Sequence, residues 1–289
     1  MRERADEPPA LTGSRRRISL PSDEYKFPRY PVFIVGSPRS GTSAMVDALL
    51  GAGYHGFREG NFLPLAYRIS VNIERHFTSF DIGSTKVLIG CVDQQMLTRE
   101  INDLFRTIVN GLNTSKPWFD KSGGPEMIRF LPTVLRLWEE GRAIFVKRRG
   151  LENITSRVRK FPNISFEQHC VDWTDTMGAW REIRSALPSD TIIEIDQWDM
   201  IRHPNTVALA LGNFLALSPD RIRALEEMLL STRPQETEPG SATRSVTLDA
   251  TEWPAAHKEI FLKHCGAEMA AFDYTLDDTY RVSNLSTGA

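Results

Sequence analysis

Short apolar runs alternate with segments of helical periodicity along most of the chain. The runs lie at residues 32–35, 54–57, 117–120, 143–146 and 191–196, and most of them lead into a polar or Gly-containing turn. Between them, apolar residues recur every three or four positions, as at Met96, Leu97, Ile101, Leu104 and Phe105. Strands that alternate with helices form βαβ units around a parallel sheet. We therefore predict an α/β fold, a three-layer α/β/α arrangement with a central parallel sheet.

The same pattern predicts where the helices begin and end. We expect them over residues 43–50, 61–77, 93–109, 126–137, 150–156, 165–187, 218–230 and 255–272. A Pro-, Gly-, Thr- and Ser-rich segment at 231–254 separates the last two. Loops of this length are uncommon in compact domains unless they are functional, so we predict that it forms a lid over a bound ligand.

Composition and charge narrow the function classes. Residues 1–28 are rich in Arg, Glu, Asp, Pro and Ser, which predicts a disordered arm ahead of a single domain at 29–289. With 289 residues, 41% hydrophobic, and a formal charge of -2, the chain is a poor candidate for non-specific nucleic-acid binding. It has no apolar run of membrane-span length and no secretory h-region, so we expect a cytoplasmic protein without membrane or nucleic-acid partners. Its three cysteines have no metal-ligand spacing. Whether the chain forms a homodimer stays open.

Residues 36–43, Gly-Ser-Pro-Arg-Ser-Gly-Thr-Ser, connect the first predicted strand to the first predicted helix. A helix beginning at Thr42 or Ser43 would point unpaired backbone N–H groups into this turn, where they attract an anion. Gly36 and Gly41 allow positive φ and close backbone approach. Arg39 adds a positive charge. We predict a P-loop-like phosphate-binding turn, although Thr42 stands where a Walker A loop has its Lys.

Three further charged residues follow predicted strands in the same way. Glu59, Lys121 and Arg148 each lie just beyond the end of an apolar run, as Arg39 does. Parallel sheets bind their ligands beyond the carboxyl ends of the strands. We therefore expect these four side chains to converge on one crevice.

The turn with its internal Arg39 resembles the 5′-phosphosulfate loop of sulfotransferases that use 3′-phosphoadenosine 5′-phosphosulfate (PAPS). Three spacings strengthen the resemblance, which covers residues from about 30 to 217. Ser156 follows Arg148 by eight residues, as in the 3′-phosphate site of that family. Glu59 lies seventeen residues after Thr42, like the base of protein tyrosine sulfotransferases and, similarly, of heparan sulfate sulfotransferases. The segment around Lys121, Phe-Asp-Lys-Ser-Gly-Gly, is similar to their Lys-containing turn but lacks its Pro.

The resemblance implies in-line sulfuryl transfer from PAPS as co-substrate, without a metal. Glu59 would be the general base, and Lys121 with Arg39 would stabilise the departing phosphate. Gly123 stands where the phenol and steroid enzymes have a catalytic His, and His55 is the reserve base. The resemblance implies that PAPS is bound by the following residues, the last of them in the predicted lid: Arg39, Ser40, Gly41, Thr42, Ser43, Arg148, Ser156 and Arg244.

Two other functions stay open at this point. In a P-loop kinase or NTPase-like phosphotransferase, Asp196 would be the Walker B residue. A non-catalytic nucleotide-binding scaffold would keep the fold and lose the chemistry. The acceptor, a small molecule, a glycan or a natural product with a hydroxyl or an amine, is not specified by the sequence. Trp173 and Trp180 share a helix face that we expect to pack in the core.

Overall fold

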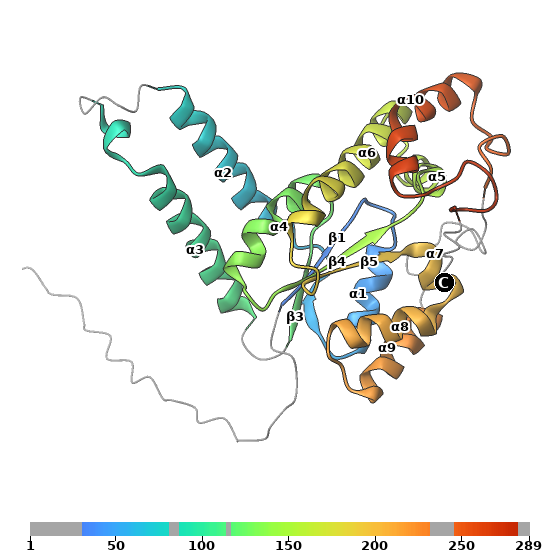
Figure 1. Ribbon diagram of the computed structural model, residues 1–289, viewed down its shortest axis with the longest axis horizontal. Coiled ribbons are helices and arrows are strands. Elements are labelled where there is room, and N and C mark those ends of the chain that lie inside the picture. Colours follow the sequence, from blue (N-terminus) through green and yellow to red (C-terminus); the bar gives the residue numbers. More distant parts are fainter. Residues whose placement is uncertain (1–30, 81–86, 114–116, 232–245, 283–289) are drawn as a thin grey trace, which may run out of the picture.

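A parallel five-stranded sheet forms the centre of the molecule (Figure 1). The computed structural model describes residues 31–80, 87–113, 117–231 and 246–282; the predicted arm at 1–28, most of the predicted lid and Arg244 lie outside them. The strands lie in the order β2-β3-β1-β4-β5. Their bounds are β1 Val32–Val35, β2 His55–Phe57, β3 Trp118–Lys121, β4 Arg142–Lys147 and β5 Ile192–Asp196.

The strand order places a topological switch point at β1. From β1 the chain moves to the edge strand β2, returns to β3 beside β1, and then adds β4 and β5 on the other side. Ile34 pairs with both Lys121 of β3 and Ile144 of β4, so the carboxyl ends of the three strands lie at one edge. This edge is where doubly wound sheets bind ligands. The predicted parallel sheet is confirmed.

Helices cover both faces of the sheet, which confirms the three layers. Side chains alternate along β1, so that Phe33 and Val35 face one core and Val32 and Ile34 face the other. The helices are α1 Thr42–Gly51, α2 Leu63–Thr78, α3 Gln94–Leu112, α4 Pro125–Leu137, α5 Gly150–Lys160, α6 Phe166–Ile183, α7 Gln197–Arg202, α8 Pro204–Phe214, α9 Pro219–Ser231 and α10 Ala255–Ala271, with 3₁₀ turns at Leu88–Cys91 and Arg184–Ala186.

The first core lies between the sheet and helices α4, α6 and α10. Trp173 and Trp180 of α6 are fully buried there, as predicted, and Trp180 stacks on Phe145 with ring centroids 4.5 Å apart. The second core joins the opposite face of the sheet to α1, α8 and α9. The strand ends are therefore supported from both sides by close packing.

Helices α7 and α8 were not predicted from the sequence. The carboxylate of Asp196 caps α7 by accepting a hydrogen bond from Trp198 N at 2.9 Å. Pro204 stands in the first turn of α8, where its missing N–H costs nothing. These two helices carry the chain from β5 down the α1 side of the sheet.

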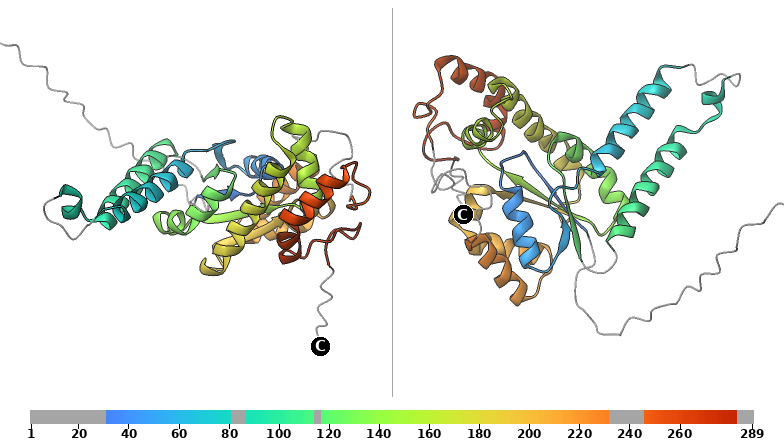
Figure 2. Two further views of the ribbon diagram at one scale, coloured as in Figure 1. Left: turned by 90° about the horizontal axis from the view of Figure 1, so that it is seen from above. Right: turned by 180° about the vertical axis from the view of Figure 1, so that it is seen from behind.

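Helices α2 and α3 form a pair that extends away from the sheet, as all the views show (Figures 1 and 2). Their contact near the sheet includes Phe62 stacked on Phe105, with centroids 4.7 Å apart. Within the described ranges, no helix combines the length and the apolar character that crossing a membrane requires.

Candidate active site

The turn after β1 passes closely over the end of β4. A Cβ atom on Gly36 would lie 2.2 Å from the carbonyl oxygen of Val146, so a larger residue does not fit there. Gly36 and Gly41 both have positive φ, 153° and 95°, and Arg39 also lies in the left-handed region with φ 72°. Glycine adopts positive φ without strain, whereas Arg39 does not, and strained non-glycine residues cluster at ligand-binding sites. The sequence thus forms the strand, turn and helix that its pattern predicted.

Helix α1 begins at Thr42, directly after this turn. Its N-cap residue, Gly41, makes no side-chain cap, and the first helical acceptor, Gly41 O, is used by Met45 N at 3.1 Å. The N–H groups of Thr42 and Ser43 precede that bond and have no acceptor within the helix. Together with the helix dipole they make this end of α1 attractive to an anion.

Two residues of α5, Asn153 and Arg157, form hydrogen bonds to the turn. The Nδ2 atom of Asn153 donates to Pro38 O and to Ser40 Oγ, both at 3.1 Å. Arg157 donates to Ser37 Oγ at 3.5 Å. Ser40 is fully buried and its hydroxyl is bound to α5. Its side chain therefore contributes to the shape of the turn. The resemblance had implied that Ser40 contacts the bound PAPS. The supporting residues Asn153 and Arg157 were not identified from the sequence.

Arg39, Arg148 and Ser156 lie together at the end of β4. Arg39 Nε donates to Ser156 Oγ at 2.9 Å, and Arg148 Nη1 donates to Arg39 O at 3.2 Å. Burial and the nearby positive charge of Arg148 lower the pKa of Arg39, and burial lowers the pKa of Arg148. Arg148 Nε is buried without a hydrogen-bond partner among the residues that the structure describes. An anion at this point would relieve the repulsion between the two guanidinium groups and offer that atom an acceptor.

On the other side of the turn, Glu59 and Lys121 form an ion pair between Lys121 Nζ and Glu59 Oε1. The side chain of Lys121 is buried, whereas 57% of the Glu59 side chain is exposed. Arg58 pairs instead with Asp47 of α1 at 2.5 Å, so it does not neutralise Glu59. The two residues predicted as base and as leaving-group cation are thus in direct contact.

The backbone that carries Glu59 is tied to the end of β3. Gly60 N donates to Lys121 O at 2.8 Å, and Asn61 N donates to Ser122 Oγ at 3.0 Å. Ser122 Oγ in turn donates to Asp120 Oδ2 at 2.8 Å. Burial raises the pKa of Asp120 to about 6, against the opposing effects of the Ser122 hydrogen bond and the Lys121 charge. The sequence did not identify this support.

Asp196 and His55, which the sequence offered as a Walker B residue and as a reserve base, make other contacts. Asp196 accepts hydrogen bonds from Tyr274 Oη at 2.7 Å and from Tyr280 Oη at 2.8 Å, so both of its oxygens are engaged. His55 Nδ1 lies 3.0 Å from Pro117 O, at the amino ends of β2 and β3, whereas Glu59 follows the carboxyl end of β2. Within the described part of the chain, no group of three or more His, Cys, Asp or Glu residues is arranged to hold a metal ion.

Comparison with known proteins agrees with this geometry. Residues 31–221 match the sequence model of the sulfotransferase family. The fold is similar to the sulfotransferase domain of the olefin synthase from Synechococcus PCC 7002, with TM-score 0.54 and 16% identity over 88% of this chain and 98% of that one. It is also similar to the sulfotransferase domain from the curacin biosynthetic pathway, with TM-score 0.51 and 16% identity over 86% of this chain and 100% of that one.

A third similar structure is the sulfotransferase STF9 from Mycobacterium avium, with TM-score 0.52 and 11% identity over 86% of this chain and 78% of that one. At these identities the likeness shows a common fold. A search of curated protein sequences finds no match.

Proposed function

Because this chain belongs to the sulfotransferase family, we propose that it moves the sulfuryl group of PAPS to a hydroxyl or amine of a small-molecule acceptor, with Glu59 as the general base. The observation that carries the donor assignment is the cluster of Arg39, Arg148 and Ser156 beside the N-terminus of α1. It offers positive charge and hydrogen-bond donors at two neighbouring points, which suits a nucleotide with both a 5′- and a 3′-phosphate.

The residues around the turn fit the two phosphate groups differently. The amides of Thr42 and Ser43, at the uncapped start of α1 directly after the turn, suit the 5′-phosphosulfate, because the first N–H groups of a helix have no acceptor within it. The guanidinium of Arg148 and the hydroxyl of Ser156 suit the 3′-phosphate, because their donors meet at the end of β4. Arg39 lies between the two positions and serves both.

PAPS supplies a sulfuryl group whose sulfur is attacked by the acceptor while the bond to the 5′-phosphate oxygen breaks. Glu59 accepts the proton of the attacking hydroxyl or amine, and its exposure leaves room for the acceptor. Lys121 and Arg39 stabilise the charge that develops on the leaving phosphate. Lys121 has three N–H donors, so it can hold Glu59 and a phosphate oxygen at the same time. Fixed cations thereby take the part that a divalent metal takes in kinases.

The acceptor approaches from the side of α2, which begins at Leu63, shortly after Glu59. The start of α2 presents the partly buried Phe62 and the buried Leu63 close to Glu59 in the chain, and apolar surface there favours an acceptor with an apolar body. The cavity of about 660 Å³ between α2 and α3 lies farther along these helices, at Ile69, Ile73, Phe77 and Leu97, and is not part of the proposed site. The sulfotransferase domains of the olefin synthase and of the curacin pathway come from systems that build natural products, and we propose an acceptor of that kind here.

Nucleotide binding separates this proposal from a kinase. We expect adenosine 3′,5′-bisphosphate to bind in the presence of EDTA and to bind more tightly than adenosine 5′-phosphate, as measured by isothermal titration calorimetry. Magnesium-dependent binding of ATP without a preference for the 3′-phosphate would favour the kinase instead. The engagement of both Asp196 oxygens by Tyr274 and Tyr280 supports the first outcome, because a metal would have to displace two buried tyrosine hydroxyls.

Turnover tests the base. With radiolabelled PAPS and a panel of alcohol, phenol and amine acceptors, Glu59→Gln should lose roughly 10²- to 10⁴-fold in kcat, because a positioned base is lost. Its affinity for adenosine 3′,5′-bisphosphate should not fall, because Glu59 does not contact the nucleotide. Lys121→Ala should lose roughly 10²- to 10³-fold in kcat and also bind PAPS more weakly, because the Lys contacts both the ground state and the transition state.

Glu74→Gln is the matched control, since Glu74 is an exposed carboxylate farther along α2. It should retain wild-type turnover and nucleotide affinity. Near wild-type turnover in Glu59→Gln would show that another group removes the proton. Absence of sulfuryl transfer by the wild type to every acceptor of the panel, despite tight binding of adenosine 3′,5′-bisphosphate, would favour the non-catalytic scaffold.

A further inference from the structure

The peptide unit between Arg148 and Arg149 is held from both sides by buried aromatic residues. Its carbonyl, Arg148 O, accepts a hydrogen bond from Trp173 Nε1 at 3.1 Å. Its amide, Arg149 N, donates to Tyr280 Oη at 3.2 Å. Trp173 and Tyr280 are 0% and 1% exposed. The plane that follows Arg148 therefore has little freedom to rotate, and the direction in which the Arg148 side chain leaves the backbone is fixed.

Tyr280 is itself held by contacts on every side. Its hydroxyl donates to Asp196 Oδ1 at 2.8 Å while it accepts from Arg149 N. Its ring stacks on Trp198 with centroids 4.4 Å apart, and the Arg149 guanidinium lies 4.8 Å from the ring centroid. Its φ of 67° is unusual for a residue with a large side chain. Such a conformation persists where the surrounding contacts impose it.

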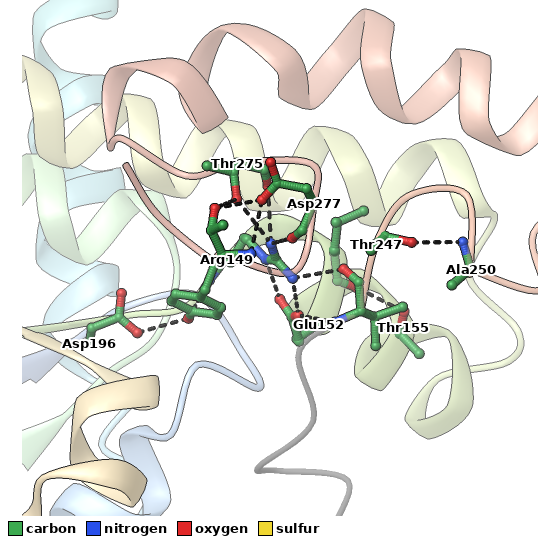
Figure 3. Close-up of polar contacts among 12 residues, drawn as sticks. Arg149, Glu152, Thr155, Asp196, Thr247, Ala250, Thr275 and Asp277 are labelled. Carbon is green, nitrogen blue, oxygen red and sulfur yellow. Dashed lines mark hydrogen bonds and ion pairs between the residues drawn. The ribbon is translucent and has the colours of Figure 1, made fainter. Parts of the chain in front are cut away.

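The side chain of Arg149 contacts Glu152 and, in the C-terminal segment, Thr275 and Asp277 (Figure 3). It pairs with Glu152 of α5 at 2.5 Å and donates to the carbonyl oxygens of Asp277 at 2.6 Å and Thr275 at 3.2 Å. Arg149 is fully buried. Because these carbonyls and Glu152 engage the guanidinium of Arg149, it is Arg148, whose buried Nε has no hydrogen-bond partner in the described part of the chain, that suits a ligand.

We propose that Tyr280 is a positioning residue for the donor site: through the Arg149 amide it aims Arg148 at the 3′-phosphate and so sets the preference for a 3′-phosphorylated nucleotide. The inference rests on the proposed function, in which Arg148 binds that phosphate. It assigns a role to residues of the C-terminal segment, which lie beyond the part of the chain that matches the family, residues 31–221. Tyr280 contacts no phosphate itself and acts through the Arg148–Arg149 peptide.

The test compares two tyrosines that share one partner. Tyr280→Phe and Tyr274→Phe each remove a single hydrogen bond to Asp196, but only Tyr280 also accepts from Arg149 N. The readout is the ratio of the dissociation constants for adenosine 5′-phosphate and adenosine 3′,5′-bisphosphate. A general loss of stability lowers both affinities and leaves this ratio in place, since the two ligands differ only in the 3′-phosphate.

We expect Tyr280→Phe to reduce the ratio by roughly 3- to 10-fold, the effect of losing about one hydrogen bond, and Tyr274→Phe to leave it unchanged. An unchanged ratio in Tyr280→Phe, or equal reductions in both variants, would overturn the inference. Should Tyr280→Phe fail to fold, Trp173→Phe takes its place, because it removes the donor on the other side of the same peptide and should shift the ratio in the same direction.

The wild type and Arg148→Ala separate this inference from the proposed function. A wild type that does not prefer adenosine 3′,5′-bisphosphate overturns both. A wild type with the preference, which Arg148→Ala abolishes and Tyr280→Phe retains, overturns only the role of Tyr280.

Discussion

The buried carboxyl group of Asp120 makes the stability of the protein depend on pH in an unusual direction. Asp120 is 8% exposed, and its pKa rises from 3.8 to about 6. Burial is the main cause, and the charge of Glu59 adds to it, while Ser122 and Lys121 act in the opposite sense. The folded state therefore binds the proton more tightly than the unfolded state does.

The sign of the effect follows from the two pKa values. Because the folded pKa is the higher one, the stability that Asp120 contributes is fully present below pH 3.8 and is lost as the pH rises through about 6. A change in pKa from 3.8 to about 6 corresponds to about 3 kcal/mol of the free energy of unfolding. About half of this loss falls between pH 5 and pH 8, where the protein can be studied without acid denaturation.

The Asp120→Asn variant removes this titration and keeps an oxygen that can accept from the Ser122 hydroxyl. We expect the variant to become more stable relative to the wild type as the pH rises, by about 1.5 kcal/mol between pH 5 and pH 8. The measurement is the free energy of unfolding from urea titrations at several pH values. The difference between the two proteins is the quantity to compare, because all other groups titrate in both.

Asp249→Asn is the control, since Asp249 is exposed near the start of α10. It removes the same charge from an exposed position, and its effect on the free energy of unfolding should be small. A difference between Asp120→Asn and wild type that is flat from pH 5 to pH 8, or that grows in favour of the wild type, would refute the reasoning. It would mean that Ser122 and Lys121 stabilise the carboxylate more than burial destabilises it.

Two further predictions concern the donor site. Arg148→Ala and Ser156→Ala should each weaken binding of adenosine 3′,5′-bisphosphate much more than binding of adenosine 5′-phosphate, as measured by calorimetry, and equal weakening of both would contradict the 3′-phosphate assignment. Gly36→Ala should lower both the melting temperature and nucleotide affinity, because the added methyl would lie 2.2 Å from Val146 O, whereas Gly111→Ala, which meets no atom within 4 Å, should not destabilise the protein.

The sequence was sufficient to predict the sheet and the edge at which we propose that its ligands bind. Buried parallel strands are short continuous apolar runs, such as residues 32–35 and 143–146, and these stand out from amphipathic helices. The polar residues directly after such runs must lie at the carboxyl edge, whatever the details of packing. For that reason the contact between Glu59 and Lys121, and that between Arg148 and Arg39, could be anticipated as a convergence before any distance was known.

The supporting residues could not be predicted in this way. Asn153 contacts Pro38 across 115 positions of the chain, and Tyr280 contacts Arg149 across 131. Neither pair carries a local pattern, since a buried Asn on a helix and a Tyr near the C-terminus have many possible partners. Helices α7 and α8 were missed for another reason. Their signals were present, with Asp196 as a cap and Pro204 in the first turn, but the segment between residues 196 and 218 was assigned no element.

The strand order explains how one edge of the sheet can carry the whole proposed reaction. Across this edge, Glu59 follows β2, Lys121 is the last residue of β3, the phosphate-binding turn follows β1, and Arg148 follows β4. In the proposed mechanism this is also the order of base, leaving-group cation, 5′-phosphosulfate and 3′-phosphate. Neighbouring strands lie about 4.8 Å apart, so β2 and β4 are separated by about 14 Å, a distance that an acceptor hydroxyl and an extended nucleotide phosphate chain together can span.

Because the chain switches direction at β1, the acceptor half and the donor half of the site come from opposite sides of that strand. The sulfuryl group would then be transferred where the two halves meet, next to Lys121. Lys121 belongs to β3, so its side chain starts from the sheet and not from a loop. Both halves of the site are therefore positioned against one strand, which favours the in-line alignment of acceptor and donor.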